Sequence, residues 1–232
     1  MKKIAVLTAL LFAALQIGYA QKVGLVLSGG GAKGAAHIGV IKALEENGIP
    51  IDYITGTSAG AIVGSLYAMG YTPEEMVELM LSEEVSYWQT GTVENEYKYY
   101  FKRPDPTPEF GHFSIDMTDS LQVKASFLPQ SLINPIQMNQ AFMALFSQAT
   151  AKAGWNFDNL FVPFRCVASD IYSKKAIIFK NGDLGDAVRA SMTFPFFFQP
   201  IWKDSVPIFD GGIYDNFPVG PMKEAFHPDF IF

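Results

Sequence analysis

The sequence predicts an α/β fold with a parallel sheet, and three observations support this fold class. First, a strand–turn–helix pattern occurs twice in succession directly after residue 20. Second, the first strand of this pattern is a continuous apolar run, which is typical of a strand buried on both faces of a parallel sheet. Third, the chain has 232 residues, of which 49% are hydrophobic, enough for one domain with a full core.

The first unit of this pattern begins with the strand Val23–Leu27. A glycine-rich turn at residues 29–34 follows, and a helix is expected over residues 35–47, with Gly48 as its stop. The apolar residues of this helix recur at helical spacing: Ile38, Ile41 and Leu44.

The second unit is a strand at residues 51–55 followed by a helix at residues 58–69. This helix is apolar almost all round, so we expect it to be buried. Thr72 and Glu75 form a capping-box pattern, which predicts that a third helix starts directly after Thr72 and covers Pro73–Leu81.

The rest of the chain is predicted in less detail. Residues 91–132 are irregular and rich in Tyr, Phe and Pro. Residues 229–232 resemble the start of a buried strand, so we expect a fragment of a longer protein, with a true C-terminal strand as the alternative. The other expected elements are helices at residues 139–153 and 183–191 and strands at residues 161–168, 176–180 and 207–210.

Residues 1–20 have the pattern of a secretory signal peptide. Two lysines give a positive start, residues 4–17 are nearly all apolar, and small residues precede a cleavage site before Gln21. The alternative is a membrane anchor, although the apolar run is short compared with the about 20 residues that cross a bilayer. We therefore expect export to the periplasm, the outer membrane, the cell surface or the medium.

Composition and charge exclude several function classes. The formal net charge is −6, so the chain lacks the basic footprint of a nucleic-acid-binding protein. The only cysteine, Cys166, lies in an apolar run and is expected to fill the core, and one cysteine allows no internal disulfide. The three histidines lie far apart, and no Cys/His cluster with metal spacing occurs, so we expect neither a metal nor another cofactor.

The sharpest functional signal is the G-x-S-x-G motif Gly56-Thr57-Ser58-Ala59-Gly60, between a predicted strand and a predicted helix. In that setting the motif predicts a nucleophile elbow, with the serine in a strained turn. Side chains two residues before and after it would collide with the turn. The start of the helix adds N–H groups and a positive dipole end near a developing oxyanion. The alternative is an ordinary Gly/Ser turn.

A second signal is the glycine loop Gly29-Gly30-Gly31-Ala32-Lys33-Gly34, which matches the dinucleotide-binding pattern. It is not a P-loop, because Ala35 follows its last glycine. No acid ends the second strand to bind a ribose, since the nearest one, Asp52, begins it. The successive N–H groups could instead form an oxyanion hole, with Lys33 adding positive field. A tight turn without further function is the third interpretation.

The nucleophile needs a base, and Asp210 has the best position for one. Both loops above follow parallel strands and are expected at the same edge of the sheet. Asp210 ends an apolar strand, and Gly211 and Gly212 after it let other backbone approach. The alternative is an ordinary Asp-Gly turn. The rival bases are the histidines, of which the first is expected to be structural: His37, His112 and His227.

In order and spacing these motifs resemble those of patatin-like phospholipases, in particular bacterial, secreted ones. The matching segments are residues 28–34, residues 56–60 and Asp210-Gly211-Gly212, and residues 189–200 also look similar. The resemblance implies a three-layer α/β/α fold with a mainly parallel central sheet over residues 21–232. It also implies a Ser–Asp dyad without histidine, with Ser58 as nucleophile, Asp210 as base and the loop 29–34 as oxyanion hole.

The expected function is therefore that of a lipid acyl hydrolase, of the phospholipase A or esterase type, with a lipid or membrane-presented ester as substrate. Apolar residues in 127–132 and 138–146 could line an acyl channel, with core packing as the alternative for each of them. In the segment before Pro200, Phe196-Phe197-Phe198 replace the smaller residues of the family. Secreted members that resemble this chain often carry an outer-membrane barrel downstream, which is expected of the longer protein. The competing class is a non-catalytic α/β module that binds a nucleotide or another anion through the glycine loop.

Overall fold

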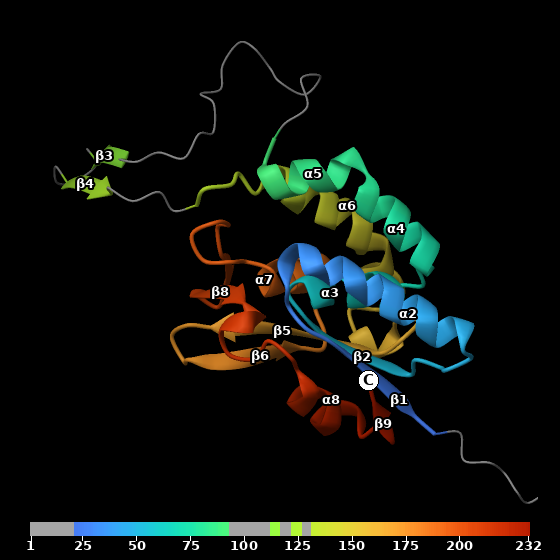
Figure 1. Cartoon of the computed structure of the whole chain (residues 1–232). Helices are drawn as coiled ribbons and strands as arrows, with labels where there is room; N and C mark the ends of the chain where they lie inside the picture. Colours follow the sequence, from blue (N-terminus) through green and yellow to red (C-terminus); the bar gives the residue numbers. More distant parts are fainter. Residues whose placement is uncertain (1–20, 93–111, 117–121, 127–130) are drawn as a thin grey trace, which may run out of the picture.

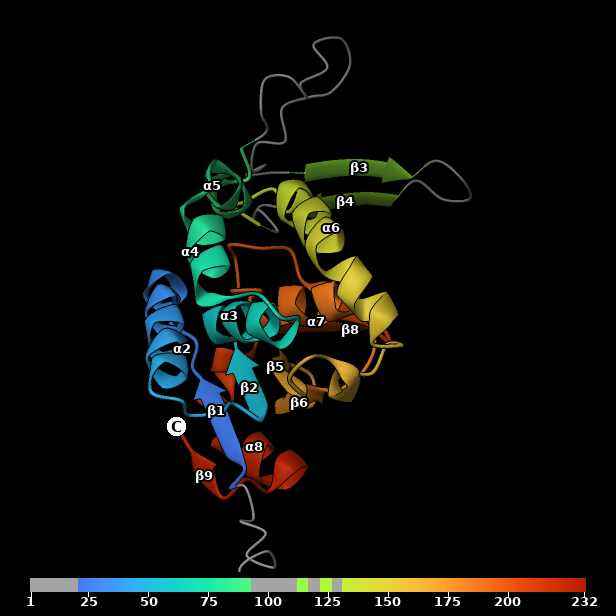
Figure 2. The ribbon, with the colours of Figure 1, turned by 90° about the vertical axis from the view of Figure 1, so that its right-hand side faces the viewer.

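The computed structural model describes residues 21–92, 112–116, 122–126 and 131–232. Within these residues, the centre of the fold is a seven-stranded sheet with helices on both faces (Figures 1 and 2). The α/β class is thus confirmed. The strand order is β7 (Ile201–Lys203), β8 (Val206–Asp210), β5 (Phe164–Asp170), β2 (Tyr53–Thr57), β1 (Val23–Leu27) and β9 (Phe230–Ile231), and β6 (Lys175–Phe179) also pairs with β5.

The sheet has a parallel and an antiparallel part. Strands β9, β1, β2 and β5 are parallel to one another, whereas β6 and β8 are antiparallel to β5, and β7 is antiparallel to β8. All five residues of β1 are buried, as the continuous apolar run predicts for a strand that is covered on both faces of the sheet.

Strand β5 has three neighbours, and their registers bring distant parts of the chain together. β2 pairs with residues 164–167 of β5, and β8 pairs with residues 168–170. β6 pairs with residues 166–170, which overlap both stretches, so β6 lies on the other edge of β5. β2 and β8 therefore follow one another along one edge. Because they run in opposite directions, their C-terminal ends meet there.

The described helices complete the three layers. On one face, α2 (Ala36–Glu46), α3 (Ala59–Ala68) and α7 (Leu184–Ser191) form an inner group, and α8 (Val219–Phe226) covers the other face (Figures 1 and 2). An outer group packs on the inner helices, away from the sheet: α4 (Pro73–Leu81), α5 (Glu83–Thr90) and α6 (Ile136–Lys152).

Two local predictions from the sequence are met in this helical layer. Helix α3 is buried from Gly60 to Ala68 with the exception of Ile62, which is half-buried, so its apolar sequence does report burial on nearly every side. At the start of α4 the Glu75 N–H donates to Thr72 Oγ1 (3.2 Å), and the Thr72 N–H donates to Glu75 Oε2 (2.8 Å), which completes the capping box.

Some element boundaries differ from the sequence prediction for reasons of pairing. β2 begins two residues late and extends through Gly56 and Thr57, because both still pair with β5. β5 begins at Phe164, directly after Pro163, which has no N–H to donate. The predicted set lacks several elements: α5, β7, α8, the hairpin of β3 (His112–Asp116) and β4 (Gln122–Ser126), and the short 3-10 turns Gly31–Ala35, Phe157–Asn159 and Gly211–Ile213.

The strand expected at residues 229–232 is present as β9, which pairs in parallel with β1. No described strand pairs with the outer side of β9, so it forms an edge of the sheet. Phe230 and Phe232 are 50% and 51% exposed in residues 21–232, and the expectation of a longer protein stays a prediction.

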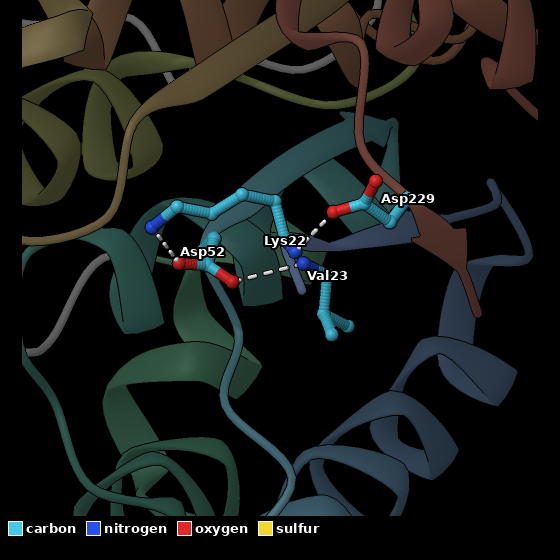
Figure 3. Close-up of polar contacts among 4 residues, drawn as sticks. All are labelled: Lys22, Val23, Asp52 and Asp229. Atoms are coloured by element: carbon cyan, nitrogen blue, oxygen red, sulfur yellow. Dashed lines mark hydrogen bonds and ion pairs between the residues drawn. The ribbon is translucent and has the colours of Figure 1, made fainter. Parts of the chain in front are cut away.

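A polar cluster fixes the start of β1 between its two neighbours (Figure 3). Asp52 accepts hydrogen bonds from Lys22 Nζ (2.7 Å) and from the Val23 N–H (2.8 Å). The Lys22 N–H donates to Asp229 Oδ2 (2.7 Å), and the Asp229 N–H donates back to the Lys22 carbonyl (2.8 Å). The cluster lies where β1 and β2 begin, at the opposite end of these strands from the glycine loop.

Candidate active site

Ser58 lies at the junction of β2 and α3, as expected for a nucleophile elbow. Its backbone has φ 54° and ψ −121°, a conformation that non-glycine residues rarely adopt. It precedes the first residue of α3, and its carbonyl accepts hydrogen bonds from the Ala61 and Ile62 N–H groups (2.9 and 3.1 Å). The surrounding structure therefore holds a strained serine at the start of a buried helix.

The two outer glycines of the motif are required by close backbone contacts. A Cβ atom on Gly56 would lie 2.5 Å from the Gly60 carbonyl oxygen and 2.8 Å from Ala61 Cα. A Cβ atom on Gly60 would overlap the Leu27 carbonyl and lie 2.7 Å from the Ser28 carbonyl oxygen, at the end of β1. A side chain at either position would therefore collide with backbone: at Gly56 with the turn itself, as predicted from the motif, and at Gly60 with the end of β1.

Asp210 ends β8 and faces Ser58. The residue is 7% exposed, and its carboxylate accepts a hydrogen bond from the Gly212 N–H (2.7 Å). Burial raises the pKa of this carboxyl above its ordinary value of 3.8, while the neighbouring Ser58 side chain and the Gly212 N–H act in the opposite direction.

The loop at residues 29–34 lies against both the elbow and the Asp-Gly-Gly turn. The Gly29 N–H donates to the Asn216 carbonyl (3.1 Å), and a Cβ atom on Gly34 would overlap that of Ala59. Thr57 Oγ1 donates to the Asp215 carbonyl (2.9 Å), which ties the elbow to the segment after Gly212. The two loops predicted to be neighbours are thus brought together with the third motif.

A cavity of about 1050 Å³ extends from Ser58 and Asp210 into the helical layer. Its polar end is formed by these two residues, Gly212, Asn216 and most of the glycine loop. Lys33 is exposed and does not line it, unlike the expectation that it adds charge there. The rest of the lining is almost entirely apolar and comes mainly from α3 to α6, the segment before α6 and the segment after α7: Ala35, Ala59, Ile62, Met80, Val85, Trp88, Gln89, Ile133, Met138, Phe142, Met192, Phe194, Phe197, Phe198 and Ile213.

The residues expected to form an acyl channel divide into three groups. Met138 and Phe142 line the cavity, whereas Phe146 is fully buried in the core. Residues 127–130 lie outside the described residues, so their expected role is without a structural counterpart. Of the three phenylalanines noted above, Phe197 and Phe198 line the cavity, and Phe196 is 74% exposed.

The histidines do not take part in the dyad where their side chains are described. His37 Nε2 lies 2.9 Å from the Ser28 carbonyl, so this ring nitrogen donates to the backbone just before the glycine loop. His227 is exposed and caps the C-terminal end of α8 with φ 48°. His112 belongs to β3, outside the residues whose side chains are described.

Sequence reasoning missed two residues that hold the site together. The Ser58 N–H donates to Ser191 Oγ (2.8 Å), and Asn216 Nδ2 donates to the Gly29 carbonyl (3.4 Å). Ser191 belongs to the 189–200 stretch noted for its resemblance, and Asn216 follows closely after Gly212. The proximity of both residues to recognised motifs could therefore have pointed to them, but their contacts with Ser58 and Gly29 depend on the fold.

The described residues form neither a metal-binding cluster nor a membrane-spanning helix. Among them, no group of three or more His, Cys, Asp or Glu side chains could hold a metal ion. No described helix is both long and apolar enough to cross a membrane. Asp52, the nearest acid to a ribose-binding position, is instead engaged with Lys22 and Val23 at the far end of β2 (Figure 3).

Comparison with curated proteins finds relatives among eukaryotes. The chain is 31% identical over 213 residues to the lysophospholipase NTE1 of Pyricularia oryzae, and 30% identical over 204 residues to that of Meyerozyma guilliermondii. These matches cover 91% and 88% of this chain but only 12% of each relative. The expected bacterial, secreted subgroup is not supported by these relatives.

A solved structure shares the fold of this chain, and a family match covers most of its sequence. Among solved structures, VipD from Legionella pneumophila has a TM-score of 0.53 at 16% identity, over 85% of this chain and 47% of that one; this similarity concerns the fold alone. The family described as patatin-like phospholipase matches residues 25–223. That range includes Ser58, Asp210 and the glycine loop, and the chain belongs to the patatin-like phospholipase family.

Proposed function

We propose that this chain is a lipid acyl hydrolase of the phospholipase A or esterase type, with Ser58 as nucleophile and Asp210 as its base. The observation that carries the proposal is that the Ser58 side chain lies beside the buried Asp210 carboxylate, at the polar end of a largely apolar cavity. A serine beside a base that can accept its proton is the arrangement that nucleophilic acyl transfer requires.

In the proposed reaction, Asp210 accepts the Ser58 proton as Ser58 Oγ attacks the ester carbonyl. Collapse of the tetrahedral intermediate releases the alcohol, which takes the proton from Asp210, and leaves an acyl-enzyme. Water then gives a proton to Asp210 and attacks the acyl group, and the fatty acid leaves as the proton returns to Ser58 Oγ. A histidine is not needed, because one carboxylate serves both half-reactions.

We assign stabilisation of the oxyanion to the glycine loop. The Ser58 N–H is already donated to Ser191 Oγ (2.8 Å), so this amide does not serve the oxyanion. Gly30 and Gly31 line the cavity together with Ser58, and the positive end of the α3 dipole points to the same place. Backbone amides at that position are suited to a developing negative charge.

The shape and polarity of the cavity support a lipid ester as the substrate. Phe194, Phe197 and Ile213 line the cavity and are also 57%, 45% and 43% exposed, so the apolar lining reaches the surface of the molecule. An apolar opening suits an acyl chain taken from a micelle or a membrane. The names of the relatives, which are lysophospholipases, are consistent with this substrate class.

We also propose that the protein is exported and processed before Gln21. The support is the pattern of residues 1–20. Cleavage before Gln21 would leave the contacts of Lys22 with Asp52 and Asp229 intact.

A fluorophosphonate probe tests the proposed function. The wild-type protein should be labelled at Ser58, as located by mass spectrometry of the modified peptide, and should hydrolyse a short p-nitrophenyl ester. Ser58→Ala should fold normally and lose both properties. Ser65→Ala is the matched control, because Ser65 is a fully buried serine on α3 that does not line the cavity. Equal turnover by wild type and Ser58→Ala would refute the assignment.

A further inference from the structure

The turn that ends α7 contacts both members of the proposed dyad. Ser191, the last residue of α7, is fully buried, and its Oγ accepts the hydrogen bond from the Ser58 N–H (2.8 Å). Two residues later, the Thr193 carbonyl accepts a hydrogen bond from the Asp210 N–H (2.8 Å). A single short segment therefore holds the backbone of Ser58 on one side and that of Asp210 on the other.

The hydroxyl of Ser191 is fixed at both of its hydrogen-bonding functions. It donates to the Val167 carbonyl of β5 (2.5 Å) while it accepts from Ser58. Val167 is paired with Thr57, the residue before Ser58. Because Ser58 has a strained backbone conformation, an acceptor for its N–H at this place directly opposes relaxation of the elbow.

The other end of the segment is held by a buried arginine. Arg189 is 3% exposed and donates to Thr193 Oγ1 (2.6 Å), to the Gln199 carbonyl (3.0 Å) and to Asn139 Oδ1 (3.0 Å). Thr193 is fully buried and its Oγ1 donates back to the Arg189 carbonyl (2.8 Å). These contacts join the turn to α6 and to the segment that continues through the cavity lining, so the turn cannot move independently of its neighbours.

We propose that Ser191 is a positioning residue that holds the Ser58 backbone in its strained conformation, so that the Ser58 hydroxyl stays aligned with Asp210. Ser191 does not contact the substrate, since it does not line the cavity. Its effect should therefore appear in the reactivity of Ser58 and not in substrate binding. This inference rests on the proposed function of Ser58 as nucleophile.

The test compares two substitutions of nearly equal shape, Ser191→Thr and Ser191→Val. Threonine keeps the hydroxyl, and valine replaces it by a methyl group, so any strain from the added methyl is common to both. We would measure kcat and KM on p-nitrophenyl butyrate and the rate of labelling by a fluorophosphonate, which reports the nucleophile directly. Ser191→Ala removes the hydroxyl group without adding a methyl group. Ser65→Ala is the control for removal of a buried hydroxyl elsewhere on the protein.

Loss of one such hydrogen bond predicts that Ser191→Ala and Ser191→Val lower kcat and the labelling rate about tenfold, with little change in KM. Ser191→Thr should recover most of the difference from Ser191→Val, and Ser65→Ala should react like wild type. Equal rates for the threonine and valine variants, or wild-type labelling of Ser191→Ala, would overturn the positioning role while Ser58 stays the nucleophile. A folded wild-type protein that neither labels nor turns over would instead overturn the proposed function and this inference with it.

Discussion

The Ser58 side chain lies beside the Asp210 carboxylate, although the strand that precedes Ser58 and the strand that ends at Asp210 run in opposite directions. β2 and β8 occupy successive stretches along the same edge of β5, and their C-terminal ends meet there. The pairing of Val167 with Thr57 and of Ala168 with Asp210 sets the distance between the two ends. An acid on an antiparallel strand thereby reaches the end of a parallel strand, where ligands of α/β sheets usually bind.

Replacing Asp210 by asparagine should abolish turnover, because an amide cannot accept the proton of Ser58. In the wild type the charged carboxylate is the active form, so kcat/KM should fall as the pH drops through the raised pKa of Asp210. The measurement is kcat/KM against pH for both proteins. Turnover by Asp210→Asn at the wild-type rate would show that another group is the base.

The same substitution should have a pH-dependent effect on stability. Burial raises the pKa of Asp210 in the folded state above 3.8, so the folded protein binds this proton more readily than the unfolded chain does. Its contribution to stability is therefore greatest at low pH and is lost as the pH rises through the raised pKa. The asparagine that replaces it stays neutral at every pH. The Tm of Asp210→Asn relative to wild type should thus increase from acidic to neutral pH, and a constant difference would contradict the desolvation argument.

The backbone contact at Gly60 predicts a large steric effect. Gly60→Ala places a methyl group against the Leu27 and Ser28 carbonyls, so it should destabilise the fold by at least about 1–3 kcal/mol. Gly39→Ala in α2 is the control, because a Cβ atom there has no neighbour within 4 Å. That change should stabilise the protein by about 0.4–1 kcal/mol. The measurement is the midpoint of urea unfolding for both variants. Equal midpoints would be inconsistent with the close backbone contacts described at Gly60.

A structural role for His37 predicts that His37→Gln keeps most of the activity. His37 Nε2 donates to the Ser28 carbonyl, and a glutamine amide can make a similar bond. His37→Ala removes this hydrogen bond, so it should lower the free energy of unfolding by about 0.5–1.5 kcal/mol. Activity and Tm of both variants provide the check. A folded His37→Gln protein without activity, beside an active Asp210→Asn, would mean that a histidine is the base.

Export predicts a mature protein that begins with Gln21. Intact mass measurement of material recovered from outside the cytoplasm should show the loss of residues 1–20. Ala20→Arg should block the cleavage, because a signal peptidase requires a small residue there. An exported protein that still begins with Met1 would point to the membrane-anchor alternative.

The sequence by itself determined the features that depend on short stretches of chain. The strand Val23–Leu27, the buried helix α3 and the capping box at Thr72 follow from local patterns of apolar and capping residues, and each is found in the structure. Ser58 and Asp210 could be selected as candidates for the same reason, since each sits in a recognisable motif at the end of an apolar strand. Helix α5, by contrast, buries only Val85, so its pattern is too weak to predict it.

Only the tertiary structure decided how these pieces act on one another. Two groups lower the pKa of Asp210 against the effect of burial, the Ser58 side chain and the Gly212 N–H. The Ser58 N–H is in turn bound by Ser191, far away in the sequence. Hydrogen bonds and desolvation depend on distances between atoms, and the strand registers on β5 set those distances. Periodicity and motifs report which residues are buried or turn the chain, but which residues of two distant strands pair with each other depends on both strands and cannot be read from either one alone.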